Sequence, residues 1–313
     1  MPAHSRRPVV VDLFAGAGGF SEGAKMAGCQ VAWAANHWEL AVKYHAANHP
    51  GTDHKCQDLH QADWSEVPEH DILLASPACQ GHSRARGRER PHHDAQRATA
   101  WAVVSCCEYR RPPFVVVENV REFLSWSLYP SWADALQRLG YTLTPHVIDA
   151  ADHGVPQNRR RVFIVCALDD VDLRLPQRQH VPARAVIDLD GYRWSKINKP
   201  GRSPTTLWKI DNGRRDHGDL FVMPFYGNTH TGRSMERPLG TVTTRDRWAV
   251  IHGDKMRMLQ PAELRAAMGF PASYQLPPNK REAVHLMGNA VCPPVARDII
   301  DALFPERSRA SIC

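Results

Sequence analysis

The first half of the chain alternates short hydrophobic runs with segments of helical character. The runs are rich in Val, Ile, Leu and Ala and predict strands at 8–14, 30–36, 71–76, 114–119, 141–149 and 161–168. The other segments predict helices at 21–28, 38–48, 94–109 and 132–139. Because continuous apolar runs alternate with helices, we expect an α/β fold built on a doubly wound, mostly parallel sheet with helices on both faces.

The second half of the chain differs from the first in its composition and in its hydrophobic pattern. Residues 171–280 are rich in Pro, Gly, Arg and Trp and show no clear helical period, so we expect a smaller, irregular domain there. Helical character returns at 281–286 and 294–304, and this end of the chain is expected to pack back on the sheet. The large domain then spans 1–170 plus 281–313, and the smaller one spans 171–280.

Composition places the chain among ordinary folded proteins. Its 313 residues are 43% hydrophobic and 23% charged, which excludes collagen, coiled coil and wholesale disorder. No stretch approaches the ~18–20 apolar residues of a membrane-spanning helix. Asp12 interrupts the first apolar run, so that run predicts a strand rather than a signal peptide. The eight cysteines show no CxxC pair and no metal-ligand spacing, so we expect free thiols, no metal site and a cytoplasmic location.

Positive charge is concentrated in two segments of the chain. The formal net charge of +6 is a mild excess, but five arginines lie within 81–97 and seven cations lie within 190–215. Basic runs are usually solvated surface. Two of them in one chain favour contacts with the phosphate groups of a polyanion.

The turn after the first strand, DLFAGAGGF (12–20), is rich in small residues that let backbone N–H groups approach a ligand. It lacks the full GxGxxG spacing of a dinucleotide site and the lysine of a P-loop, which favours an adenosine-type ligand without a pyrophosphate. Asp58 is a candidate to accept a hydrogen bond from the adenine amino group. The alternative is that Asp58 caps a helix, which is the commoner use of such a residue.

Two further strands are followed by reactive side chains. Cys79 follows the strand at 71–76, within SPACQGHS (76–83), where α/β enzymes place their reactive groups. A buried structural cysteine is the alternative, but the polar, arginine-rich segment that follows favours an accessible thiolate. Glu118 lies at the end of the strand at 114–119, and a glutamate in an apolar crevice can carry a raised pKa and donate a proton.

Five motifs, in this order, resemble those of the DNA (cytosine-5)-methyltransferase family: DLFAGAGGF, PACQGHS, ENV, QNRRR (157–161) and HLMGNAV (285–291). The resemblance covers the whole chain and implies a Rossmann-like fold that uses S-adenosylmethionine. It implies that Cys79 attacks C6 of a cytosine flipped out of double-stranded DNA, so that C5 can accept a methyl group. Glu118 would hydrogen-bond or protonate N3, and Arg159 and Arg161 would stabilise charge and orient the ring.

The resemblance also implies which residues bind the cofactor and the DNA. Those implied at the S-adenosylmethionine site are Phe14, Ala15, Gly16, Gly18, Gly19, His37, Trp38, Asp58, Leu59, Pro77, Asn289, Ala290 and Val291. Those implied at the DNA are His82, Ser83, Arg84, Arg86, Arg193, Lys196 and Arg202, with Trp194, Lys209 and Arg214 as further candidates in the target-recognition region. We also expect a monomer that has a cognate restriction endonuclease as its partner and does not associate with membranes.

Three positions depart from the family pattern. Ala78 stands where a second proline usually precedes the cysteine, and Ser76 stands where glycine is common. His37 stands where a glutamate usually binds both ribose hydroxyls, although an imidazole accepts at most one hydrogen bond. One interpretation is that the site tolerates histidine at this position and still binds the usual cofactor, with His37 or Glu39 hydrogen-bonded to the ribose. The other is a less acidic site that admits carboxy-S-adenosylmethionine and yields 5-carboxymethylcytosine.

Two other functions fit the same motifs. RNA methylation is less favoured, because the arginine-rich loop and the separate recognition region are typical of DNA methylation. A DNA-binding protein that has lost catalysis is the second alternative. The presence of Cys79, Glu118, Arg159 and Arg161 weighs against this second alternative.

Overall fold

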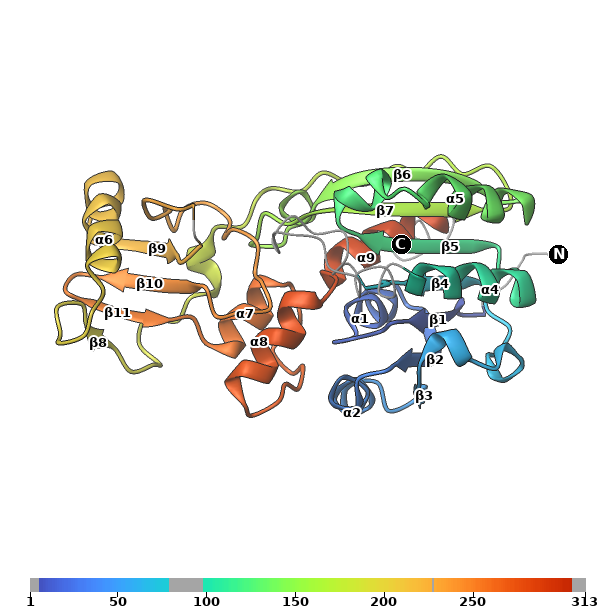
Figure 1. The fold of residues 1–313 in the computed structure, drawn as a ribbon, viewed down its shortest axis with the longest axis horizontal. Helices are drawn as coiled ribbons and strands as arrows, with labels where there is room; N and C mark the ends of the chain where they lie inside the picture. Colours follow the sequence, from blue (N-terminus) through green and yellow to red (C-terminus); the bar gives the residue numbers. More distant parts are fainter. Residues whose placement is uncertain (1–5, 79–97, 227, 306–313) are drawn as a thin grey trace. The chain divides into compact units, whose positions relative to one another are not determined.

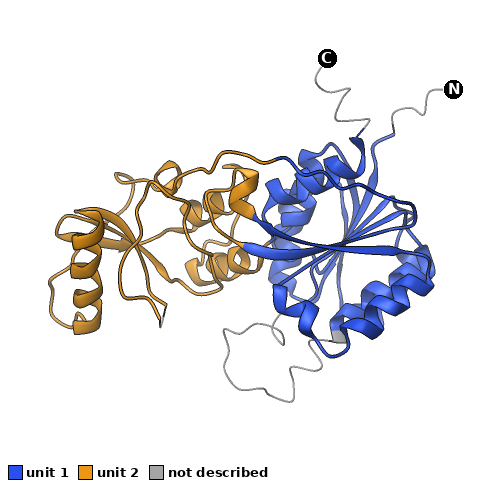
Figure 2. Cartoon of the chain, turned by 90° about the horizontal axis from the view of Figure 1, so that it is seen from above, with its two compact units in different colours: residues 1–149, 160–176, 291–313 blue, residues 150–159, 177–290 orange. Residues whose placement is uncertain are grey.

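The computed structural model describes residues 6–78, 98–226 and 228–305, which form two compact units (Figure 2). Unit 1 contains Met1–Asp149, Arg160–Pro176 and Val291–Cys313, and unit 2 contains Ala150–Arg159 and Gln177–Ala290. Each unit has its own sheet and its own hydrophobic core. The functional division that the sequence predicts at residues 170 and 281 stays a prediction.

Unit 1 is built on a seven-stranded sheet with the order β3-β2-β1-β4-β5-β7-β6 (Figure 1). Its strands are β1 (Val9–Leu13), β2 (Gln30–Asn36), β3 (Asp53–Cys56), β4 (Ile72–Ala75), β5 (Phe114–Asn119), β6 (Thr142–Asp149) and β7 (Arg160–Ala167). The strands from β3 to β5 in this order pair in parallel, whereas β7 is antiparallel to both β5 and β6. The expected α/β fold with a mostly parallel sheet is confirmed.

Helices cover both faces of this sheet (Figure 2). They are α1 (Gly19–Met26), α2 (Glu39–Asn48), α4 (Trp101–Arg110), α5 (Tyr129–Arg138) and α9 (Pro293–Leu303), with short 3-10 turns η1 (Leu59–Gln61), η2 (Trp64–Glu66), η4 (Ala98–Ala100) and η5 (Arg121–Ser125). Val11 and Leu13 of β1 share a core with Trp132 of α5. Because side chains alternate along a strand, Asp12 lies on the opposite face, where it contacts Ser21 of α1.

Unit 2 contains a four-stranded antiparallel sheet with the order β8-β11-β10-β9. Its elements are β8 (Ser195–Lys196), β9 (Leu220–Pro224), β10 (Trp248–His252), β11 (Lys255–Met258), α6 (Pro204–His217), α7 (Pro261–Ala267), α8 (Lys280–Asn289), η6 (Ala150–His153) and η7 (Ala183–Val186). Ile210 of α6 shares a core with Phe221 and Ile251 of the sheet. Within the described ranges of the chain, no helix is long and apolar enough to cross a membrane.

Most elements of unit 1 lie where the hydrophobic pattern predicts them, and β2 and β5 match to the residue. The pattern missed β3, a four-residue edge strand of mostly polar residues. The expectation of no clear helix within 171–280 was wrong, because α6 is a helix of 14 residues. Only Lys209, Ile210 and Gly213 of α6 are buried, so its apolar face is too narrow to produce a helical period.

Candidate functional site

The carboxyl ends of β1 to β5 lie along one edge of the unit 1 sheet, because these five strands are parallel. Backbone hydrogen bonds join the segments that leave neighbouring strands. Ala15 N–H donates to Ala35 O at 3.0 Å, and Ser76 N–H donates to Leu13 O at 3.2 Å. Open α/β sheets bind their ligands at this edge, and the topology brings the predicted turns together there.

The glycine-rich turn after β1 consists mainly of small residues and contains unusual backbone conformations. Phe14, Gly16 and Gly18 have φ angles of 61°, 55° and 75°, which is left-handed backbone. Two of these positions are glycines, whereas Phe14 holds a conformation that costs strain and that surrounding structure must enforce. Gly19 meets a different constraint, because a Cβ there would lie 2.0 Å from Val291 O. Close packing of α1 on the segment before α9 therefore requires a glycine at 19.

Polar and aromatic side chains follow β2 and β3. His37 is exposed and Trp38 is half-buried, and Trp38 N–H donates to Asn36 Oδ1 at 2.9 Å, which shapes the turn into α2. Asp58 Oδ1 accepts a hydrogen bond from His60 N–H at 3.0 Å, so Asp58 does cap η1. Within the described ranges, the cap is the hydrogen bond found for this carboxylate, and it uses one of the two oxygens. Leu59, beside it, is buried.

Glu118 and Arg161 form an ion pair at the same edge of the sheet. Glu118 is 7% exposed at the end of β5, and its Oε1 lies 3.2 Å from Arg161 Nε on β7. Arg161 Nη1 also donates to Arg160 O at 2.8 Å, which holds the guanidinium in place. A guanidinium beside a nearly buried carboxylate compensates its charge. The pair presents hydrogen-bond acceptors and donors side by side, an arrangement that can bind the polar edge of a planar heterocycle.

The segment that leaves β4 is fixed by two side chains from other elements. Asn119 is 1% exposed, and its Nδ2 donates to Pro77 O at 3.1 Å. Ala78 N–H donates to Thr99 Oγ1 at 3.2 Å. Neither Asn119 nor Thr99 was predicted from the sequence to fix the segment after β4. The position of Asn119 directly after Glu118 in the ENV motif is the signal that could have pointed to it.

Five of the predicted site residues lie outside the described part of the chain: Cys79, His82, Ser83, Arg84 and Arg86. Their roles stay predictions. Ala78 is covalently joined to Cys79, so the contacts at Pro77 and Ala78 define where the segment that carries the predicted nucleophile begins.

Arg159 lies in unit 2 and is only 4% exposed. Its Nη1 donates to Val242 O at 2.9 Å, and its Nη2 donates to Gly288 O at 3.0 Å and to Ala290 O at 3.1 Å. Arg159 and Arg161 are two residues apart in the QNRRR motif, and the resemblance implies that both act on the base. The structure gives them separate partners, and Arg159 holds the TVTT segment (241–244) to the end of α8.

The C-terminal motif spans the boundary between the two units. Asn289 ends α8 and is exposed, whereas Ala290 and Val291 are buried. Gly288 allows α8 to pack closely within unit 2, because a Cβ there would lie 2.2 Å from Thr244 N. Val291 belongs to unit 1, where its backbone meets Gly19.

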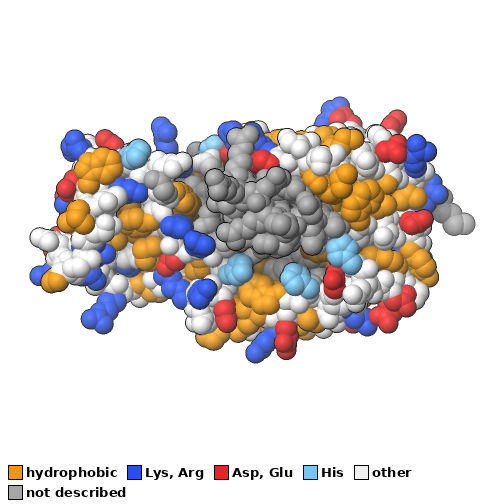
Figure 3. Space-filling model, in the orientation of Figure 1, with side chains coloured by type: hydrophobic (Ala, Val, Ile, Leu, Met, Phe, Trp, Pro, Cys, Tyr) orange, Lys and Arg blue, Asp and Glu red, His pale blue; other side chains and the backbone are white. Residues whose placement is uncertain are grey.

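The predicted DNA-binding cations of unit 2 fall into two groups. Arg193 and Lys196 are exposed. The others are engaged within the unit: Arg202 Nε donates to Ile197 O at 3.1 Å, Lys209 Nζ to Tyr226 O at 3.1 Å, Arg214 Nη2 to Gly253 O at 2.6 Å, and Trp194 Nε1 to Leu189 O at 3.1 Å. On the face seen in Figure 3, Lys and Arg side chains are scattered among hydrophobic and uncharged residues and form no single patch.

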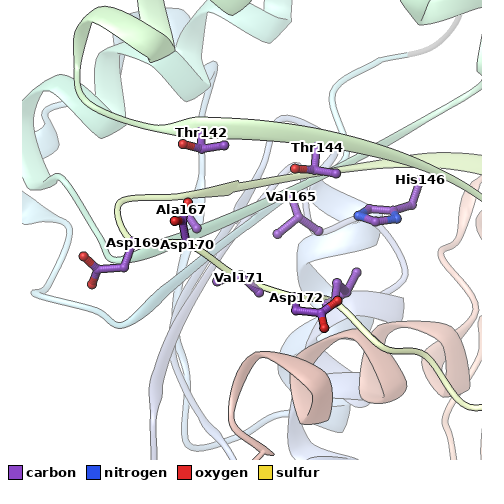
Figure 4. A pocket seen from close by; sticks show the side chains of 10 residues that line it. Thr142, Thr144, His146, Val165, Ala167, Asp169, Asp170, Val171 and Asp172 are labelled. Carbon is purple, nitrogen blue, oxygen red and sulfur yellow. The ribbon is translucent and has the colours of Figure 1, made fainter.

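One cavity of about 450 Å³ within unit 1 is lined by residues of β6, β7 and the segment after β7 (Figure 4). Its lining side chains are polar or acidic at several positions, including Thr144, His146, Asp169 and Asp170. It contains no predicted site residue. Among the described residues, no cluster of His, Cys, Asp and Glu has the geometry of a metal site.

The family model described as C-5 cytosine-specific DNA methylase matches residues 9–212 and 202–305. The type II methyltransferase M.NlaX of Neisseria lactamica is 30% identical, over 96% of this chain and 98% of its own length. M.NgoBI of Neisseria gonorrhoeae is 26% identical, over 95% and 94%. A solved structure of a prophage-encoded E. coli protein shares the fold, with a TM-score of 0.72 at 19% identity over 95% of this chain and 99% of that one.

Proposed function

Because the chain belongs to the C-5 cytosine-specific DNA methylase family and is a DNA (cytosine-5)-methyltransferase, we propose that it methylates a flipped-out cytosine through a covalent adduct with Cys79. The observation that carries the proposal is the Glu118–Arg161 ion pair at the carboxyl edge of the sheet. The same edge bears the glycine-rich turn and the segment that leads into Cys79. The residues proposed for the base and for the cofactor thus lie on neighbouring strands.

The residues at this edge fit an adenosyl cofactor. S-Adenosylmethionine, when bound, supplies a methyl group on a positively charged sulfur. The half-buried ring of Trp38 offers an apolar face for the adenine, and the second carboxylate oxygen of Asp58 can accept from its amino group. The turn from Phe14 to Gly18 leaves room for the backbone to approach the ligand.

Cys79 and Glu118 act on the cytosine ring in the proposed reaction. The Cys79 thiolate forms a bond to C6, and the electron pair of the C5–C6 double bond makes C5 nucleophilic. Glu118 bonds the N3 edge of the ring, and Arg161 orients Glu118 and compensates charge as the adduct forms. C5 takes the methyl group as the bond between that group and the sulfonium sulfur breaks, which would leave S-adenosylhomocysteine. The C5 proton then passes to a solvent base and the bond between C6 and the Cys79 sulfur breaks, which restores the thiolate and the C5–C6 double bond.

Covalent trapping on duplex DNA that contains 5-fluorocytosine tests this proposal. Fluorine blocks loss of the C5 proton, so the full chain should form a stable adduct that depends on S-adenosylmethionine. Cys79→Ser should abolish the adduct, and Glu118→Gln should slow its formation about a hundredfold. Glu108→Gln, at an exposed position of α4, is the matched control and should react like the unchanged protein. An adduct that persists in Cys79→Ser would overturn the proposal.

His37 motivates a narrower hypothesis about the transferred group. It is exposed beside Trp38, just after the end of β2. The carboxylate that is usual at this position would repel an anionic ligand, whereas a neutral imidazole would not. A carboxylated cofactor would then be tolerated and would give 5-carboxymethylcytosine. Mass spectrometry of the product nucleoside after reaction with each cofactor tests this hypothesis. Detection of 5-methylcytosine alone under both conditions would refute it.

The relatives named above are type II methyltransferases, which suggests a role for this chain in protecting DNA from a restriction endonuclease. We propose that it acts as a monomer on double-stranded DNA and that a cognate endonuclease shares its recognition sequence. Bisulfite sequencing of DNA from cells that express the chain would report activity and target sequence together. A restriction enzyme of that specificity should then fail to cut the methylated DNA.

A further inference from the structure

A line of polar side chains runs through unit 1 from β1 to β3, on the sheet face that carries Asp12. Ser21 Oγ lies 2.6 Å from Asp12 Oδ2, and on its other side it lies 2.9 Å from His45 Nε2. His45 Nδ1 lies 2.8 Å from His54 Nε2. His54 also hydrogen-bonds the backbone at Thr52. Four side chains from β1, α1, α2 and β3 are therefore joined end to end, and we call them the relay.

The relay connects a buried carboxylate to the surface. Asp12 and Ser21 are fully buried and His45 is 2% exposed, whereas His54 is partly exposed. Asp12 Oδ1 has no hydrogen-bond partner within the described residues, so Oδ2 carries all of the polar contacts found for this carboxyl group. A proton that leaves Asp12 along hydrogen bonds can reach solvent through His54.

The inner end of the relay also closes the glycine-rich turn. Ser21 N–H donates to Asp12 Oδ2 at 3.1 Å, in addition to the contact of the hydroxyl. Asp12 immediately precedes, and Ser21 immediately follows, the segment 13–20 that contains the turn. The strength of the contacts between Asp12 and Ser21 therefore bears on how firmly the turn is held.

Only two directions of hydrogen bonding satisfy the relay along its length. With Asp12 protonated, its O–H donates to Ser21, Ser21 donates to His45 Nε2, His45 Nδ1–H donates to His54, and His54 donates to Thr52. With Asp12 ionised, Ser21 donates to the carboxylate, His45 Nε2–H donates to Ser21, and His54 Nε2–H donates to His45, while the neutral His54 has given up the Nδ1 proton that it donated to Thr52. Loss of one proton from Asp12 thus reverses the bonds and changes the tautomer of His45.

The hydrogen bonds of the relay reverse direction near neutral pH. Burial raises the pKa of Asp12 to about 7, whereas burial holds the pKa of His45 well below its ordinary value. Burial also lowers the pKa of His54, against the opposing effects of the Thr52 bond and of Asp53. His45 therefore stays neutral and passes a proton on rather than storing one.

The other charged groups around the relay have partners of their own. On α1, Glu22 Oε2 lies 3.5 Å from Lys25 Nζ and 3.8 Å from His49 Nε2 of α2. Burial lowers the pKa of His49 to about 4, so His49 is neutral at physiological pH. On α9, which packs against α1, Asp298 is bound by Arg297 at 2.7 Å.

We propose that Asp12, Ser21, His45 and His54 form a proton relay through which solvent pH sets how firmly the glycine-rich turn is held, and so sets the affinity for S-adenosylmethionine. The inference rests on the proposed function in one respect, that the cofactor binds at this turn. Burial favours the neutral carboxyl group over the carboxylate, so the closed turn is the arrangement in which Asp12 keeps its proton, and loss of that proton favours an opening that returns the carboxylate to water. Affinity therefore falls as pH rises through neutrality.

Binding of S-adenosylmethionine to the full chain, measured by calorimetry between pH 6 and pH 8, tests the relay. Affinity should fall about fivefold from pH 6 to pH 8 in the unchanged protein, the change expected from about 1 kcal/mol. His45→Gln keeps groups that can donate and accept but cannot exchange tautomers, so its affinity should vary less than about twofold. His70→Gln, at a buried histidine outside the relay, is the matched control and should keep the fivefold fall.

The tautomer of His45 supplies a readout that does not depend on the cofactor. In ¹⁵N spectra of histidine-labelled protein, the His45 signal, assigned by its loss in His45→Gln, should change from the Nδ1–H to the Nε2–H form between pH 6 and pH 8. A single tautomer throughout, or an unchanged pH dependence of affinity in His45→Gln, would overturn the relay. If the tautomer changes but the unchanged protein binds no S-adenosylmethionine at any pH, the proposed cofactor site fails instead.

Discussion

Arg161 Nε lies 3.2 Å from Glu118 Oε1, and this contact joins two motifs that are far apart in the chain. It depends on the antiparallel pairing of β5 with β7, in which Glu118 is opposite Phe163 and Asn119 is opposite Val162. This register places Arg161 just beyond the end of β5, beside the glutamate. A carboxylate that is 7% exposed thereby gains a cationic partner.

Arg161→Ala should reduce the rate of methyl transfer about a hundredfold, because Glu118 loses the group that orients it and compensates its charge. Single-turnover methylation of a duplex measures the effect. Arg160→Ala is the matched control, since the adjacent Arg160 side chain is 70% exposed and pairs with Asp149. Equal losses in the two variants would contradict a specific role for Arg161.

Asn119→Ala should lower kcat by about ten- to a hundredfold with little change in KM for DNA, because Pro77 loses the bond that fixes the start of the segment carrying Cys79. Steady-state kinetics separates the two constants. Thr99→Val removes the matching bond to Ala78 N–H and should act in the same direction. A rise in KM at unchanged kcat would show that Asn119 serves binding and not the position of the nucleophile.

Arg159→Ala should destabilise unit 2 by about 3 kcal/mol or more, because three backbone carbonyls lose a charged donor in a buried setting. Urea unfolding followed by tryptophan fluorescence measures the free energy of unfolding. Arg184→Ala breaks an exposed pair with Glu236 in the same unit and should cost less than about 1 kcal/mol. A stable but inactive Arg159→Ala protein would instead favour a direct catalytic role.

The stability of the protein should depend on pH through Asp12. Its carboxyl group has an ordinary pKa of 3.8, and burial raises the pKa to about 7 in the fold. Between these values the folded protein keeps a proton that the unfolded chain has lost, so the free energy of unfolding falls as pH rises from about 4 to about 7 and levels off above. The contribution amounts to at most about 4 kcal/mol.

Urea unfolding of the unchanged protein and of Asp12→Asn, at a series of pH values from 4 to 8, checks this dependence. Asn cannot ionise, so the difference in free energy between the two proteins should shrink across the window. Asp134→Asn, at an exposed residue of α5, should leave the slope unchanged. A difference that stays constant with pH would show that the pKa of Asp12 is not raised in the folded state.

Local patterns were enough to predict the framework of unit 1. The apolar runs of β1, β2 and β5 are buried, and a strand buried on both faces needs a continuous hydrophobic sequence that is visible without any partner. The turn motifs at the strand ends could be assigned to one edge, because parallel strands must all point the same way. The same reasoning failed for β3 and for α6, whose stability comes from neighbours rather than from their own pattern.

The residues by themselves determined the family, the order of the motifs and the kinds of side chain that could attack or bind a base. Packing alone decided which of those side chains are available. Arg159 and Arg161 are two residues apart and chemically identical, yet one is surrounded by backbone carbonyls and the other faces a carboxylate. The contacts of Asn119 with Pro77 and of Asp12 with His54 through Ser21 and His45 were likewise invisible in the sequence. A buried polar group must find its partner in three dimensions, and no local pattern records which distant segment supplies it.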